Sequence, residues 1–198
     1  MSYRDLKSYQ TATIIYDFTV EFCDIYVENR TDPPAGEAGK THKSYRFYSR
    51  MSDQMIQAAR SGKQNIVEAS TERTSQKSEL KLLGVSRASF QELLEDFEDF
   101  LRQRSLSLWG KDHPKAREIR ALAYRTDKSY RTYRTYLSDS ATAANVAICL
   151  INQVNFLLDR QIKSLEEKFV KNGGWSENIY KKREQARKRQ RNPIADHW

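Results

Sequence analysis

The longest regular apolar pattern of the chain lies between residues 140 and 171. Its apolar positions recur at alternating steps of four and three residues, which is the spacing of a helix that packs one face along its neighbours. Asn172-Gly173-Gly174 follows and is expected to end this helix. Such a helix is typical of helical bundles. The stripe consists of Ala144, Ile148, Ile151, Asn155, Leu158, Ile162, Leu165 and Phe169.

Three further segments show helical spacing, at about residues 8–28, 52–70 and 76–104. The stripe of the third is interrupted only by Arg87, and no segment shows the alternation of a strand. The four helices predict an all-α fold, an antiparallel up-down four-helix bundle. In the 52–70 segment the stripe is built mostly from small residues: Met55, Ala59, Gly62, Ile66 and Ala69.

Proline, glycine and helix-capping residues predict where the segments of the chain begin and end. Residues 1–173 are expected to form the bundle, with an exposed loop at 30–50 and a helical insertion at 106–139, while residues 174–198 form a basic helical tail. Ser52 is expected to cap the second helix, and Ser75 or Thr74 the third. Pro114 is expected in the first turn of a short helix within the insertion, opened by Asp112 or His113.

The positive charge is concentrated at the C-terminal end. The 198 residues suffice for one buried domain, and their net charge is +8. Residues 180–198 hold seven Lys and Arg against Glu184 and Asp196, a net +5, so the rest of the chain carries only +3. The basic character therefore belongs largely to the tail.

The two cysteines, Cys23 and Cys149, lie among apolar residues on expected helices. This favours buried, reduced thiols over a disulfide and points to a cytoplasmic protein. The N-terminus has no apolar leader, and no apolar run is long enough to predict a membrane span.

Patterns of catalytic chemistry are weak throughout. His42, His113 and His197 are not spaced as a metal or catalytic pair, and the Glu-x-x-His motif of bundle metal sites is missing. The acidic run from Glu92 to Asp99 is interpreted as a solvated helix face. The sequence therefore predicts no enzyme, no metal and no cofactor.

Three segments hold residue types that are typical of nucleic-acid binding: residues 45–50, residues 124–136 and the basic tail. Tyrosine alternates with arginine in residues 45–50 and 124–136, a pattern that suits stacking on bases and neutralising phosphates. The tail could serve as an arm that contacts phosphates. Equally, the tyrosines could pack onto the bundle and the tail could be a disordered, solubilising end. The candidate residues are Arg46, Arg50, Arg125, Tyr130, Arg131, Tyr133, Arg134, Lys181, Lys182, Arg183, Arg187, Lys188 and Arg189.

Polar residues also occur where the bundle should be apolar. Residues 57–70 read QAARSGKQNIVEAS, and we expect Asn65 and Glu68 to pair inside the bundle with asparagines of the fourth helix or polar groups of the third. Asn65→Ala is then expected to lower thermal stability. The expected structural signature comprises Gly62, Asn65, Glu68, Asn152 and Asn155.

Several separated motifs occur in a familiar order over residues 3–171. The motifs are Tyr3-Arg-Asp-Leu-Lys-Ser-Tyr-Gln10, Gln57-Ala-Ala-Arg-Ser61, Asn65-Ile-Val-Glu-Ala-Ser70, Glu79-Leu80, Ala88-Ser89 with Glu92-Leu93, Phe97-Glu-Asp-Phe-Leu-Arg-Gln-Arg104 with Trp109, and Leu158-Asp-Arg-Gln161. With these motifs the chain resembles the bacterial four-helix-bundle family that includes proteins encoded within 23S ribosomal RNA genes and the accessory variability determinant of diversity-generating retroelements. It is most similar to the branch with a four helix bundle suffix domain.

The resemblance implies a non-catalytic protein. In retroelements the accessory protein forms a pentameric barrel that binds nucleic acid and a reverse transcriptase. We therefore expect a homo-oligomer that binds RNA or single strands, with a reverse transcriptase or another protein as a possible partner, and no membrane association. The alternative is a protein-protein interaction module with no affinity for nucleic acid.

Overall fold

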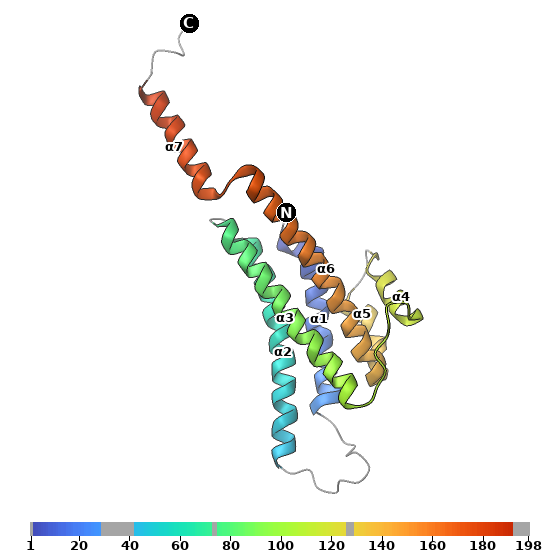
Figure 1. Ribbon diagram of the computed structural model, residues 1–198. Helices are drawn as coiled ribbons and strands as arrows, with labels where there is room; N and C mark the ends of the chain where they lie inside the picture. The colour runs from blue at the N-terminus through green and yellow to red at the C-terminus, as the bar shows by residue number, and fades with distance from the viewer. Residues whose placement is uncertain (1, 29–41, 73–74, 126–128, 192–198) are drawn as a thin grey trace.

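The protein is all-α. A computed structural model describes residues 2–28, 42–72, 75–125 and 129–191, of which residues 42–49, 172, 175 and 191 are described by their backbone only (Figure 1). Within these ranges the chain forms helices joined by turns, and no strand occurs. The predicted fold class is confirmed at this level.

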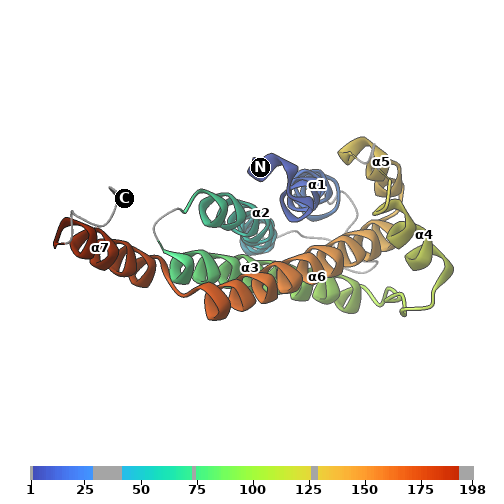
Figure 2. The same ribbon diagram turned by 90° about the horizontal axis from the view of Figure 1, so that it is seen from above.

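Four long helices make up most of the protein, and we call them the helical body. Each has two long neighbours: the first and the third both contact the second and the fourth (Figures 1 and 2). The first continues directly into the π-helical segment η2 (Asp24–Glu28). The four are α1 (Lys7–Cys23), α2 (His42–Thr71), α3 (Gln76–Gln103) and α6 (Ser140–Asn172).

Shorter helices complete the chain. The predicted insertion contains α4 (Pro114–Leu122), which packs on α6, and α5 (Tyr130–Arg134), which packs on α1 and leads into η3 (Thr135–Ser138). Pro114 occupies the first turn of α4, as predicted, and His113 is its N-cap residue. A last helix, α7 (Trp175–Arg191), extends beyond the end of the helical body (Figures 1 and 2).

The core is formed by the predicted apolar faces. Phe22 of α1 lies edge-on to Phe97 and Phe100 of α3, with ring centroids 4.9 and 4.8 Å apart, and all three rings are buried. The stripe of α6 is buried from Ala144 to Leu158 and becomes exposed toward its end. The C-terminal part of α6 is therefore only partly covered by the other helices.

The contact between α2 and α3 around Gly62, Ser86 and Phe90, which we call the seam, explains the small residues of α2. Gly62 is buried, and a Cβ atom added to it would lie 2.7 Å from the ring of Phe90, well inside van der Waals contact. This close approach lets the buried hydroxyl of Ser86 donate to the carbonyl oxygen of Gly62 over 2.8 Å. The absence of a side chain at Gly62 is therefore required by packing.

The expected pairing of Asn65 and Glu68 with asparagines of the fourth helix or polar groups of the third is wrong. Glu68 is exposed, and the half-buried Asn65 donates to the carbonyl and hydroxyl oxygens of Ser61 on its own helix. The link to α3 is made instead by the hydroxyl of Ser61, which lies 3.0 Å from that of Ser89. A long carboxylate reaches water from this face, whereas two short hydroxyls fit between closely packed helices.

The two asparagines expected on α6 have different surroundings. Asn155 is buried, as predicted, and its Oδ1 accepts no hydrogen bond from the described residues. Asn152 is exposed and donates to the carbonyl of Ile148, so its place in a buried signature is wrong. Asn152 follows a buried stripe residue directly and therefore faces about 100° away from it.

The second helix begins earlier than predicted, at His42 rather than at Ser52. Residues 42–50 of the expected loop at 30–50 therefore belong to α2, and its part at 30–41 lies outside the described residues. Ser52 is buried inside α2, where its hydroxyl donates to the carboxylate of Glu28. Residues 42–51 contain neither Pro nor Gly, so nothing in them ends a helix.

The other predicted helix ends are confirmed. Ser75 caps α3 by accepting from the amide of Ser78. Asp139 caps α6, and Gly173, with φ of 72°, ends it. The segment beginning at Ser140 is the one part of the described chain long and apolar enough to cross a membrane, and 67% of its apolar window is buried in the protein, as in the core helix of a soluble protein.

Candidate nucleic-acid interface

The basic tail forms a helix whose described Lys and Arg side chains are exposed. α7 follows the Gly173-Gly174 break and has a net charge of +5 from its seven Lys and Arg and two Glu. Consecutive helical residues point about 100° apart, so the run from Lys181 to Arg183 spreads charge around the helix. The six predicted candidates are exposed: Lys181, Lys182, Arg183, Arg187, Lys188 and Arg189.

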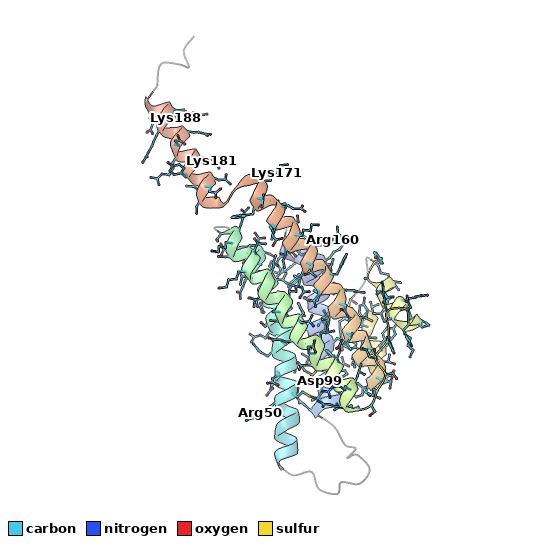
Figure 3. All side chains as sticks on the ribbon, viewed as in Figure 1. Arg50, Asp99, Arg160, Lys171, Lys181 and Lys188 are labelled. Atoms are coloured by element: carbon cyan, nitrogen blue, oxygen red, sulfur yellow. The ribbon has the colours of Figure 1, made fainter. Side chains whose placement is uncertain are left out.

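Few of these cations are neutralised within the helix. Lys188 pairs with Glu184 at 2.9 Å, and both side chains are largely exposed. Glu177 lies in the first turn, where its carboxylate accepts from the amide of Gly174. Figure 3 shows Lys181 and Lys188 on the part of α7 that projects from the body. Counter-ions in solution therefore balance most of this charge.

The tyrosines of the insertion belong to the body. Tyr133 is 1% exposed and lies in the hydrophobic core, and this burial raises its pKa. Tyr130 is half-buried against the same core, with its hydroxyl oxygen buried. The ring of Tyr133 therefore presents no open face to a base. Tyr133 is thus wrong as a stacking residue, because the three-residue spacing of these tyrosines places them on the inward face of α5 and η3.

The arginines of the insertion remain at the surface. Arg131 and Arg125 are exposed. Arg134 donates to the carboxylate of Glu21 on α1 over 3.0 Å and so fastens α5 to the body. In the predicted segment 45–50, Arg50 is exposed on α2, and the side chain of Arg46 lies outside the described part of the chain.

The candidate residues of the insertion and those of the tail do not come together. The insertion lies beside the beginning of α6, and α7 follows its end (Figure 1). α6 has 33 residues and therefore spans about 50 Å. The tail and the insertion are separate surfaces, and the six exposed candidate cations of the tail lie together on one helix.

A groove between α4 and α6 was not predicted. It has a volume of about 630 Å³ and also borders the first turns of α1 and residues 109–111. Four cations line it, Lys7, Lys111, Arg120 and Arg160, and none of the described lining residues is acidic. Three aromatic residues line it as well: Trp109, Tyr124 and Phe156.

Side-chain amides of α6 hold the walls of this groove. Asn145 is buried, accepts from the amide of Trp109 over 2.7 Å and donates to the carbonyl of Ser107 over 2.9 Å. Gln153 donates to the carbonyl of Ile119 at the end of α4. The buried polar residue Asn145 thus positions the segment that leads to the groove.

Sequence reasoning missed the groove because its residues come from distant segments. One local signal was present: Phe156 lies outside the apolar stripe of α6 and is 60% exposed, with Arg160 one turn further on. The guanidinium of Arg160 lies 5.8 Å from the centre of the Phe156 ring. An aromatic side chain off the buried stripe, followed by a cation at the fourth position, could have marked this face.

No metal-binding group of three or more His, Cys, Asp and Glu occurs among the described residues. The chain matches none of the protein-family models, curated proteins or solved structures with which it was compared. The expected family membership therefore stays a prediction, and the residues themselves carry the functional argument.

Proposed function

We propose that the protein is a non-enzymatic accessory protein that binds RNA or single-stranded nucleic acid through α7. The observation that carries the proposal is the exposure of six Lys and Arg side chains on a helix that stands off the body. A flexible single strand can wrap such a helix, because its cations point in several directions. Release of counter-ions from the strand then drives binding.

The body is proposed to be an antiparallel up-down four-helix bundle that carries α7. Support comes from the neighbour contacts among α1, α2, α3 and α6, and from Figure 1, in which consecutive helices of these four run in opposite directions. The short link between α2 and α3 is typical of antiparallel neighbours. The proposed compartment is the cytoplasm, in keeping with the free thiols Cys23 and Cys149.

Assembly into a homo-oligomer is also part of the proposal. Large apolar side chains are exposed where α6 and α7 leave the body: Val170 is 84% exposed, its neighbour Phe169 is exposed, and so is Tyr180 of α7. Exposed apolar surface of this kind is often covered by a partner. A pentamer and a reverse-transcriptase partner follow from the family resemblance alone. Light scattering after size-exclusion chromatography would measure the oligomer.

A pair of matched variants tests the role of α7. Replacing Lys181, Lys182 and Arg183 with Gln removes three charges from α7. The matched control removes three exposed cations from three helices of the body: Arg60, Lys81 and Lys163. In a mobility assay with single-stranded RNA, we expect at least about a tenfold loss of affinity for the α7 variant and little change for the control.

Equal losses in both variants would show that only the overall charge matters and would refute a specific role of α7. Failure of the unmodified protein to bind any nucleic acid with salt sensitivity would favour the alternative, a protein-protein interaction module. Melting temperatures of all three proteins must agree, since both sets of residues are exposed and substitutions at such positions usually change stability by less than about 0.5 kcal/mol.

A further inference from the structure

The groove between α4 and α6 has the size of a small-molecule site. Its volume of about 630 Å³ lies within the range of roughly 300–1,000 Å³ found for ligand pockets. Its walls are fixed to each other by the hydrogen bonds of Asn145 and Gln153 described above. The site is therefore formed before any ligand arrives.

The charge of the groove selects an anion. Lys7 comes from α1, Arg160 from α6, and Lys111 and Arg120 from the insertion, and no described lining residue supplies a carboxylate. Arg120 donates to the carbonyl of Lys111, which orients its guanidinium without neutralising it. The positive field of Arg120 also acts on the pKa of Cys149 in the groove, opposing the rise caused by burial. Cations from three segments thus surround one space.

The apolar part of the groove is aromatic. Phe156 is 60% and Tyr124 is 90% exposed, and they stand on two different elements that border the groove. Such exposure of large rings is not needed for the packing of the core. Planar rings beside cations match a ligand that is itself planar and carries a negative group, because stacking and charge neutralisation then act on neighbouring parts of one molecule.

We propose that this groove holds one nucleotide, with its base stacked on Phe156 and its phosphate among Lys7, Arg120 and Arg160. The nucleotide is either free or part of a single strand. The proposal deepens the proposed function by naming where a base would be held, and it involves no residue of α7.

A cysteine within the groove provides the test. Cys149 is half-buried and lines the groove, whereas Cys23 is fully buried and burial raises its pKa to about 12. The rate of alkylation by N-ethylmaleimide at mildly alkaline pH, followed by intact-protein mass spectrometry, therefore reports on access to Cys149. A Cys149→Ser variant assigns the signal.

The full-length protein is alkylated with adenosine monophosphate, tri-adenylate RNA, inorganic phosphate or laurate present. We expect adenosine monophosphate or tri-adenylate to slow alkylation. Phe156→Ala should weaken this protection roughly five- to a hundredfold, as expected for one lost stacking contact. Val85→Ala, at an exposed apolar residue of α3 that does not line the groove, is the control and should protect normally.

The arms of the experiment separate the possible ligands. Protection by the mononucleotide identifies a free nucleotide, and protection by tri-adenylate alone identifies a segment of a strand. Protection by phosphate or laurate as strong as by the nucleotides, or undiminished protection in Phe156→Ala, would overturn the proposal. Repeating the test with the Lys181, Lys182 and Arg183 variant separates this site from α7, because protection by the mononucleotide should persist there even if α7 binds nothing.

Discussion

The surface of a helix serves opposite purposes in two regions of this protein. In the seam between α2 and α3 it packs closely against another helix, and in α7 it is exposed to solvent. In the seam, Gly62 brings two backbones so close that a serine hydroxyl bonds a helix carbonyl. In α7, ten consecutive residues from 181 to 190 are exposed. The seam gains its stability from tight contact, whereas α7 makes few contacts and keeps its charge available. The comparison separates what holds this protein together from what it offers to a partner.

The largest expected effect on stability comes from filling the seam with Gly62→Ala. The new methyl group would overlap the buried ring of Phe90, and such overpacking costs about 1–3 kcal/mol, offset in part by the roughly 1 kcal/mol better helix propensity of alanine. We expect a net loss of up to about 2 kcal/mol in the free energy of unfolding, measured with urea.

Gly84→Ala is the matched control for this prediction. Gly84 lies exposed in α3, and nothing lies within 4 Å of a Cβ atom added there. Alanine should therefore stabilise the protein by about 0.5–1 kcal/mol through helix propensity alone. If both glycine variants gained stability alike, the close packing of the seam would be disproved.

A smaller effect on stability is expected at Asp96, whose carboxylate the body partly buries. Burial raises the pKa of Asp96, and Asp99 and Glu92 raise it further. The folded state then binds the proton more tightly than the unfolded state, so this group destabilises the fold as pH rises through its folded pKa. Asp96→Asn should increase stability at pH 7 and reduce the gain in stability seen on acidification toward the ordinary aspartate range, about pH 4.

Thermal unfolding between neutral and mildly acidic pH measures this change. Asp53→Asn, at an exposed position of α2, is the control and should follow the pH dependence of the unmodified protein. A lower stability of Asp96→Asn at neutral pH would mean that the carboxylate is stabilised by the fold. Partial burial in the body would then not make a charge destabilising, and the body would not differ from α7 in this respect.

The sequence predicted the elements whose signals are local. The stripes of α3 and α6, the Ser75 cap, Pro114 at the start of α4 and the Gly173 stop all depend on neighbouring residues, and the structure contains them. The predicted start at Ser52 failed because a serine that caps a helix and one that bonds a distant Glu28 look the same in sequence.

The candidate site was predicted less well, for a related reason. The exposed cations of α7 could be found from composition. The inward face of Tyr133 could not, because the same three-residue spacing serves a buried stripe and an exposed one. The groove was missed since Lys7, Arg120 and Phe156 are more than thirty residues apart in the chain and meet only after folding.

The most direct test of the central claim is the salt dependence of RNA binding. For single strands, the logarithm of the binding constant falls with the logarithm of salt concentration by about 0.7 per neutralised phosphate, so six cations of α7 predict a slope of roughly −4. Replacing Lys181, Lys182, Arg183, Arg187, Lys188 and Arg189 with Gln should bring the slope close to zero. An unchanged slope in that variant would contradict the account.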